Sequence, residues 1–563
     1  MNREPSTSKK AVFIFITVIL GLLVIELGVR GIEAGAGYFF THNNSPYVEY
    51  ENVRKVFETR SINGIAYHIR TSYHPHIQSG LRFPVEKSLH TFRVFCLGGS
   101  AAMGWPHPLN ESYPAFLEKK LKLLYPEKNI EVINVAASTY ASYRVKVIFD
   151  EIINYHPDLL LVYSGNNEFL ERILYPQQVL LEAPWKHIAT IRTVLRALTQ
   201  MGHKKQVIDI ENYQPTFLID VALGNTSPLK ISEKQYKQAV KHYRYNMEAM
   251  IAAAQDKGIP IMLLTVPANV RDWSPHASVH VPALDSTHLK QWQQYYREGI
   301  KAFEAAKYDQ AIKIWKYAAT LDAEYAELHY YLGKAYLANK NIRKASMHLM
   351  QSLEADAYPF RALPTLNDVL KNLSNTYDVP LADIQHILAK NSKYGITGLD
   401  VLVDHVHPTV SSNQVIANEV LLTLEKSGLI SKTDTTVLAA LSLPVYENAE
   451  ATLPLMQNLF LIYRVLLQFD KMDDLYERCR QLPAHEKQSP EYQQFMSEFD
   501  RFLEVVQPYK KLLFAHKTGQ LHQQFTQAEI ITIVQNYVEL NKKSLTANMS
   551  AQEFEQFLPV FIK

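Results

Sequence analysis

Four side chains that could act together in acyl transfer are spread over three short segments of the sequence. Ser100 follows an apolar run and two glycines in FRVFCLGGS, Asn167 lies in YSGNNEFLE, and Asp404 and His407 fall in DHVHP. A serine hydroxyl becomes a nucleophile when an imidazole takes its proton, and a carboxylate holds that imidazole in one tautomer. An asparagine amide can donate to the oxyanion that then forms. These residue types therefore suit cleavage or transfer of an acyl group.

Each of these residues also has a plain structural interpretation. A serine after two glycines is often only a turn residue, and Asn167 could cap a helix that begins in FLERI. An Asp-His pair before proline is a common entry to a helix. His405 also competes with His407 for the role of the base.

The elements that must position these residues follow an alternation of strands and helices. Unbroken apolar segments separated by amphipathic helices predict a parallel sheet covered on both faces, a three-layer α/β/α domain. Ligands bind such sheets beyond the carboxyl ends of the strands, where Ser100 falls. The expected strands are 92–97, 130–136, 158–165 and 259–267, and the expected helices include 143–155 and 234–257.

Three short motifs carry a family resemblance. The segments Gly98–Ser100 (GGS), Gly165–Asn167 (GNN) and Asp404–His407 (DHVH) occur in the order and at the strand ends typical of the SGNH (GDSL-type) hydrolases, which this chain resembles. The resemblance covers roughly 92–290 and 393–428. More narrowly, the chain is similar to membrane-anchored bacterial members with a tetratricopeptide-like insertion.

The resemblance implies a role for each candidate residue. Ser100 would be the nucleophile, His407 the base and then the acid, and Asp404 the residue that orients His407. Asn167 and the Ser100 N–H would stabilise the oxyanion, together with the N–H of Thr139. No metal or organic cofactor is implied.

Two positions depart from the family pattern. Gly99 stands where the family commonly has aspartate, a change expected to tune the nucleophile turn more than to abolish chemistry. Thr139 stands where the family has a glycine that donates to the oxyanion. A threonine there is costly if the backbone has a positive φ angle.

Two arginines follow the expected strands and could contact the substrate. Arg144 and Arg271 would meet an anionic or carbonyl group at the open edge of the sheet. They could equally be surface residues that form salt bridges.

The N-terminus predicts a membrane anchor. Arg3, Lys9 and Lys10 precede an apolar run over 11–30, which is long enough to cross a hydrocarbon core. We expect 1–10 to be cytoplasmic and the rest extracytoplasmic, hence periplasmic if the source is bacterial. A cleavable signal peptide is the alternative.

A 34-residue repeat interrupts the α/β pattern, because Gly299 and Trp315 recur in register as Gly333 and Leu349. This step is typical of tetratricopeptide repeats, whose paired helices approach closely at small residues. We expect these repeats to offer a surface for a protein partner. The predicted order is a lead-in segment (31–91), the first part of the hydrolase-like domain (92–290), the repeats (291–357), its second part (358–430) and a helical domain (431–563).

Composition excludes other classes of function. The 58 basic and 56 acidic residues nearly balance, which argues against a nucleic-acid partner. Cys96 and Cys479 are the only cysteines in the sequence, too few for a disulfide framework or a cysteine zinc site.

Two functions remain from the sequence. The first is a membrane-anchored extracytoplasmic serine esterase or acyltransferase that acts on an ester or acyl-bearing substrate, such as a polysaccharide or a lipid. The second is a catalytically silent scaffold that binds a protein partner through its repeats. The two could also combine, with docking by the repeats and acyl transfer by the serine.

Overall fold

The chain divides into two compact units, and the elements described below belong to the larger one, 55–174 with 214–563. The smaller unit contains the predicted anchor, whose residues 11–20 and 22 lie outside the described part; the rest of it is helical. Among the described residues, no helix is long and apolar enough to cross a membrane. The computed structural model describes residues 21, 23–30, 55–169, 231–431, 452–465 and 468–542.

A five-stranded parallel sheet forms the centre of the larger unit, in the order β5-β4-β6-β7-β8. The strands are short and apolar, and β6 and β7 are buried along their whole length, as a sheet covered on both faces requires. The bounds are β4 Thr91–Gly98, β5 Asn129–Asn134, β6 Leu159–Tyr163, β7 Ile261–Leu264 and β8 Leu381–Ala382.

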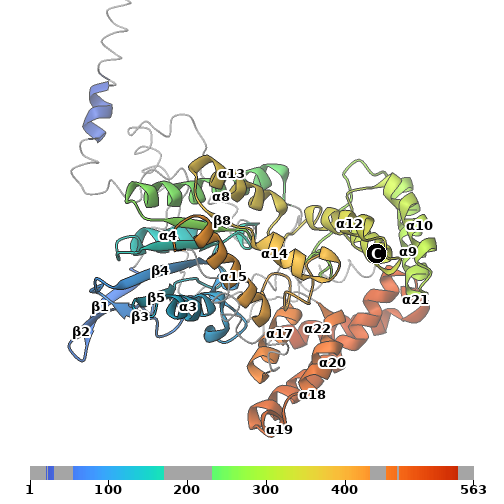
Figure 1. The fold of residues 1–563 in the computed structure, drawn as a ribbon. Coiled ribbons are helices and arrows are strands. Elements are labelled where there is room, and N and C mark those ends of the chain that lie inside the picture. Colours follow the sequence, from blue (N-terminus) through green and yellow to red (C-terminus); the bar gives the residue numbers. More distant parts are fainter. Residues whose placement is uncertain are drawn as a thin grey trace, which may run out of the picture. The chain divides into compact units, whose positions relative to one another are not determined.

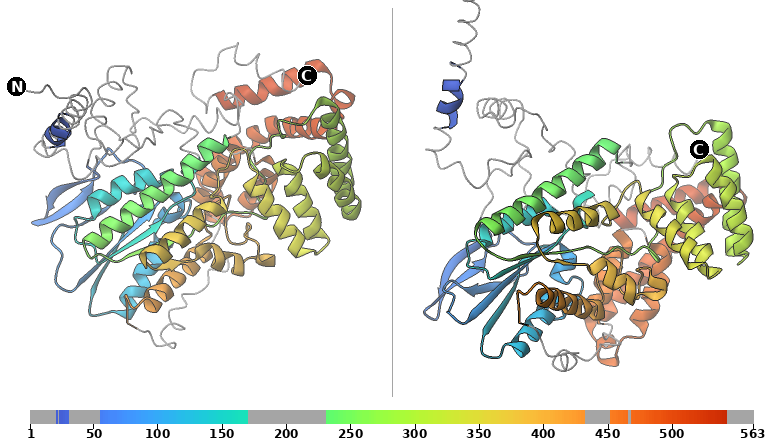
Figure 2. Two further views of the ribbon diagram at one scale, coloured as in Figure 1. Left: turned by 90° about the horizontal axis from the view of Figure 1, so that it is seen from above. Right: turned by 45° about the horizontal axis from the view of Figure 1, so that its top comes forward.

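Helices cover both faces of this sheet, which confirms the predicted α/β class. Helices α4 (Ser142–Ile152), α8 (Glu233–Asp256) and α13 (Pro364–Tyr377) pack on one face, and α3 (Tyr113–Leu124) and α15 (Val410–Lys426) on the other (Figures 1 and 2). The sheet and these helices thus form three layers around an apolar core.

Local sequence signals account for where two of these helices begin. The Ser112 hydroxyl accepts a hydrogen bond from the Ala115 amide at the start of α3, and Pro114 occupies its first turn. Ser232 and Gln235 form a reciprocal capping box at the start of α8.

The segment before β4, which we expected to be an extended lead-in, contains a small antiparallel sheet. Asn63 and Gly64, both at positive φ, form a two-residue turn between its first two strands. The amides of Val56 and Phe57 donate to the Glu151 carboxylate, which ties this sheet to α4. Its strands are β1 Phe57–Ile62, β2 Ile65–Arg70 and β3 Arg82–Pro84.

Two helical hairpins occupy the region of the 34-residue repeat. A Cβ atom placed on Gly299 would lie 2.1 Å from the Trp315 ring, and one placed on Gly333 would lie 2.5 Å from Leu349 Cγ. The repeated glycines therefore allow the helices of each hairpin to touch. The helices are α9 Ser286–Glu304, α10 Tyr308–Leu321, α11 Ala326–Ala338 and α12 Ile342–Glu354.

The C-terminal helices share a second apolar core with residues from the α/β region, including Trp273, Tyr358 and Phe360. The described C-terminal helices therefore pack against the α/β domain rather than only against one another. The bounds are α17 Leu453–Val465, α18 Met472–Arg480, α19 Ala484–Lys487, α20 Pro490–Lys517, α21 Leu521–Gln524 and α22 Gln527–Lys542, and α14, which precedes the DHVH segment, spans Ile384–Asn391.

Candidate active site

The candidate nucleophile lies at the carboxyl end of β4, where the strand turns into the short helix α2 (Ser100–Met103). A Cβ atom on Gly98 would lie 2.0 Å from the carbonyl oxygen of Tyr163 on β6, so only glycine allows this approach of the two strands. The Ser100 N–H opens α2 and has no acceptor within that helix. The turn thus places a serine hydroxyl at the edge of the sheet.

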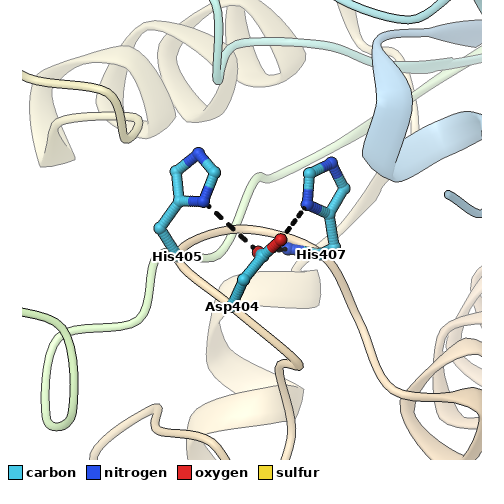
Figure 3. Close-up of side chains that lie close together, drawn as sticks. All are labelled: Asp404, His405 and His407. Atoms are coloured by element: carbon cyan, nitrogen blue, oxygen red, sulfur yellow. Dashed lines mark hydrogen bonds and ion pairs between the residues drawn. The ribbon is translucent and has the colours of Figure 1, made fainter. Parts of the chain in front are cut away.

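Three of the predicted residues meet there through side-chain hydrogen bonds. Ser100 Oγ lies 2.7 Å from His407 Nε2. His407 Nδ1 lies 2.6 Å from Asp404 Oδ2, the bond drawn in Figure 3. Asp404 is fully buried and His407 is 4% exposed. A hydroxyl, an imidazole and a carboxylate in this chain of bonds have the geometry of a nucleophile, its base and the group that orients the base.

The Asp404 carboxylate is held in its charged form. Its Oδ1 accepts hydrogen bonds from the amides of Val406 and His407, both at 2.9 Å. Burial alone would raise the pKa of Asp404, but the His407 and His405 imidazoles and their hydrogen bonds hold it well below its usual range. The carboxylate can therefore stabilise positive charge on His407.

His405, the alternative base, lies on the other side of the same carboxylate (Figure 3). Its Nδ1 is 3.4 Å from Asp404 Oδ1, and its ring packs against Trp273 with the centroids 5.3 Å apart. Burial lowers the pKa of His405 despite the nearby carboxylate. The structure bonds Ser100 to His407, so His405 is a packing neighbour of the acid.

The donor atoms of Asp404, His405 and His407 lie within 4.8 Å of one another, a spacing that a metal ion could also use. The Asp404 oxygens, however, already accept from two backbone amides and from the His407 ring. These bonds are those of a carboxylate that orients a base.

The candidate oxyanion donors lie on two further strand ends. Asn167 follows β6, and its Nδ2 donates to the Tyr140 carbonyl oxygen at 3.1 Å, which leaves its second amide hydrogen for another acceptor. Thr139 follows β5 and has φ of 65°, the left-handed conformation that favours glycine. The departure from the family pattern at Thr139 therefore marks a strained backbone position. Thr139 nevertheless keeps the N–H that could donate to an oxyanion.

Glu168, which is not among the predicted site residues, holds the start of the helix that follows the Thr139 loop. Its carboxylate accepts from the backbone amide of Ser142 at 2.6 Å and from the Ser142 hydroxyl at 2.8 Å. These bonds hold the first turn of α4, which follows the Thr139 loop. Its place beside Asn167 in GNNE was the available signal.

The two predicted substrate-binding arginines have different environments. Arg144 is buried beside Tyr140 and Tyr143, with its guanidinium 5.2 Å and 5.8 Å from the two ring centroids. It therefore lies next to the Thr139 loop rather than on the surface.

Arg271 forms salt bridges, the alternative to the predicted substrate contact. Its guanidinium pairs with Asp272 at 2.9 Å and with Asp400 at 2.8 Å, and it also donates to the Lys393 carbonyl oxygen. Because these bonds occupy its donors, the Arg271 guanidinium holds the 393–400 segment in place and is not placed to bind a substrate. Two of these partners, Asp400 and Lys393, lie more than 100 positions away in the sequence, so the sequence could not reveal them.

Two side chains from the nucleophile loop cover the base. The Trp105 ring packs edge-on against His407 with the centroids 4.6 Å apart. His107 Nε2 lies 3.0 Å from the Pro408 carbonyl oxygen, and burial lowers the pKa of His107 to about 4. Neutral His107 thus joins the nucleophile loop to the loop that carries the base.

No family model matches the chain, and no curated protein matches it. Among solved structures, one similar chain is LAE5, an alpha/beta hydrolase enzyme from the metagenome of Lake Arreo, with 12% identity over 62% of this chain and 99% of that chain and a TM-score of 0.27. Another is the acetylxylan esterase Axe2 from Geobacillus stearothermophilus, with 13% identity over 60% of this chain and 94% of that chain and a TM-score of 0.28. A proposed GDSL-like lipase from Parabacteroides merdae is also similar (12%, 62% and 99%, TM-score 0.29).

Proposed function

We propose that this chain is a serine esterase or acyltransferase that forms an acyl-enzyme on Ser100. The observation that carries the proposal is the continuous chain of short bonds from Ser100 Oγ through His407 to Asp404. These residues come from segments about 300 positions apart, and chance packing rarely aligns a hydroxyl, both imidazole nitrogens and a buried carboxylate.

In the first half-reaction, Ser100 Oγ attacks the carbonyl carbon of an ester while His407 Nε2 takes the hydroxyl proton. Charge develops on the carbonyl oxygen, where the free amide hydrogen of Asn167 and the N–H groups of Ser100 and Thr139 can donate. His407 then returns the proton to the leaving alcohol, and the acyl group stays on Ser100.

In the second half-reaction, water or an acceptor alcohol attacks the acyl-enzyme. His407 Nε2 takes the proton from the attacking group and gives it back to Ser100 Oγ as the acyl group leaves. Water as the acceptor makes the protein an esterase, and a sugar hydroxyl as the acceptor makes it an acyltransferase.

The setting of this chemistry is part of the proposal. An apolar segment over 11–30 would anchor the protein in a membrane with its body extracytoplasmic, periplasmic in a bacterium. The substrate would be an ester or acyl-bearing polysaccharide or lipid, and the helical hairpins over 291–357 would dock a protein partner. The sequence composition and the resemblance support these proposals.

Hydrolysis of p-nitrophenyl esters of increasing acyl length tests the proposed reaction. We expect turnover by the full chain, and a loss of about 10⁴-fold or more in Ser100→Ala, because the nucleophile is removed. Ser88→Ala is the matched control, since Ser88 precedes the same strand and bonds only Thr91 among the described residues.

Two outcomes would count against the reaction. Equal rates for the wild type and Ser100→Ala would assign the turnover to another group. No turnover of any ester by a well-folded wild type would favour the silent scaffold, which a search for partners of 291–357 would then pursue.

A further inference from the structure

Helix α17 of the C-terminal region bonds to both loops of the candidate active site. Asn458 Nδ2 donates to the Pro106 carbonyl oxygen at 3.2 Å, and the Tyr463 hydroxyl donates to the Val403 carbonyl oxygen at 3.0 Å. Pro106 lies in the loop that follows the nucleophile, and Val403 directly precedes Asp404. One helix thus contacts the backbone on both sides of the Ser100–His407 bond.

The Tyr463 bond is buried in the interior of the larger unit. Tyr463 is 3% exposed, and its ring centroid lies 5.8 Å from that of Trp273, the side chain that also packs on His405. Burial and the nearby Asp404 charge raise the pKa of Tyr463, so the phenol keeps its proton and remains a donor. A buried hydrogen bond of this kind is costly to remove.

The opposite face of the Asp404 segment is held by a residue of the α/β domain. The side chain of Asn269 donates through Nδ2 to the Asp404 carbonyl oxygen at 2.9 Å, and its backbone N–H donates to the His405 carbonyl oxygen at 2.9 Å. The segment that carries the acid is therefore fixed between a loop of the α/β domain and the C-terminal helix.

We propose that Asn458 and Tyr463 are positioning residues of the active site, and that α17 sets the distance between the nucleophile loop and the acid–base loop. This inference rests on the proposed function for its catalytic consequence. It assigns a role to a helical region in which the sequence shows no cluster suggestive of chemistry.

The role follows from the sensitivity of acyl transfer to geometry. A displacement of about 1 Å between reacting groups can cost on the order of 10²-fold in rate. Neither side chain takes part in proton transfer, so its loss should lower the rate of the chemical step and leave substrate binding nearly unchanged.

The test compares two changes that remove a tyrosine hydroxyl from the same helical region. Tyr463→Phe deletes the bond to Val403, and Tyr492→Phe deletes a bond from a buried tyrosine to the Cys479 carbonyl oxygen, remote from the site. We expect Tyr463→Phe to lower kcat and the rate of fluorophosphonate labelling about tenfold, with KM within about twofold. Tyr492→Phe should leave all three values at the wild-type level, although it too removes a buried hydroxyl that donates to a backbone carbonyl oxygen, at 3.4 Å.

A second pair of variants covers the nucleophile side of α17. Asn458→Ala deletes the bond to Pro106, and Gln457→Ala changes the exposed neighbouring residue. We expect a severalfold fall in kcat for Asn458→Ala alone, and a double variant with Tyr463→Phe that falls further than either single change.

Hydrogen exchange of the full chain separates this inference from the proposed function, because it needs no turnover. The amides of Val406 and His407 are bonded to Asp404, so their exchange reports the order of the acid–base loop. We expect peptides over 400–409 to exchange faster in Tyr463→Phe than in Tyr492→Phe. A wild type that is not labelled overturns the proposed reaction, and the exchange result then decides the positioning role alone.

The positioning role is overturned if Tyr463→Phe and Tyr492→Phe exchange and react alike. It is also overturned if the two variants lose equal thermal stability and equal activity, because α17 would then contribute only to general folding.

Discussion

The nucleophile turn (98–104) and the acid–base loop (403–408) meet in one hydrogen bond, yet they are held in place differently. The turn is shaped by its own residues: Gly98 lets two strands touch, and α2 begins two positions later. Much of its geometry therefore follows from a few neighbouring residues.

The acid–base loop depends on contacts with distant segments. Asn269 bonds its backbone from the α/β domain, Tyr463 bonds it from the C-terminal region, and Arg271 clamps the segment that precedes it. A short motif can therefore specify a nucleophile, whereas the position of its base depends on contacts across the whole larger unit.

After removal of the nucleophile itself, the largest effect should come from changing the acid without changing the loop. Asp404→Asn keeps an oxygen that can accept from the Val406 and His407 amides, but it removes the charge that orients the imidazole. We expect kcat to fall about 10³–10⁴-fold with little change in the unfolding midpoint. A fall of less than tenfold would show that Asp404 only shapes the loop.

A change in the nucleophile turn should act through the oxyanion donor. A Cβ atom on Gly99 would lie 2.8 Å from Asn167 Nδ2, so Gly99→Ala must displace that amide. We expect kcat to fall on the order of 10²-fold, as on loss of an oxyanion donor. In a double-mutant cycle, Gly99→Ala should have little further effect in the Asn167→Ala background. Additive losses would contradict this coupling.

The contact between His107 and the Pro408 carbonyl oxygen, which joins the nucleophile loop to the acid–base loop, should make the free energy of unfolding depend on pH. Burial lowers the pKa of His107 from 6.5 to about 4, so between these values the unfolded chain binds a proton that the folded chain does not. The free energy of unfolding should therefore fall as pH drops from about 6.5 to 4, by on the order of 2 kcal/mol from this residue.

Chemical denaturation at a series of pH values measures that contribution. His107→Gln keeps a donor for Pro408 and should flatten the fall, whereas a change at the exposed His90 should not. An unchanged pH dependence in His107→Gln would place the sensitive group elsewhere.

The smallest effect should come from relieving the strained position. Thr139 has φ of 65°, a conformation that costs most residues about 1–2 kcal/mol and glycine little. Because glycine loses more entropy on folding, Thr139→Gly should stabilise the protein by only about 0.5–1 kcal/mol in urea unfolding. Activity should stay within about twofold if the N–H is what the site uses. Destabilisation would show that the threonine side chain contributes more than its strain costs.

The parallel sheet and the four candidate site residues could be predicted from the sequence because each strand and each motif is a short local pattern. Apolar runs predicted β4, β5, β6 and β7, and three short motifs contain Ser100, Asn167, Asp404 and His407. The first two motifs follow β4 and β6, as expected, whereas DHVH lies in a loop after α14. The two-residue strand β8 had no such pattern. The Asn63–Gly64 hairpin did carry a turn signal in the sequence, although it was not among the predicted elements.

The residues that hold the site loops in place, such as Arg271 and Tyr463, could not be predicted from the sequence. Arg271 has the residue type of a substrate ligand, and only its partners Asp272 and Asp400 show that it is structural. Tyr463 lies about 60 positions from the backbone that it bonds, in a helix with an ordinary apolar pattern. Such roles arise from the way that distant segments pack.

The central claim is that His407 activates Ser100, and labelling with a fluorophosphonate followed by mass spectrometry tests it most directly. The account predicts one adduct on Ser100 in the wild type, none in Ser100→Ala, and labelling slowed by about 10³-fold or more in His407→Ala, with His405→Ala retaining the adduct. Labelling of Ser100 that persists in His407→Ala, or an adduct on another serine, would contradict the account.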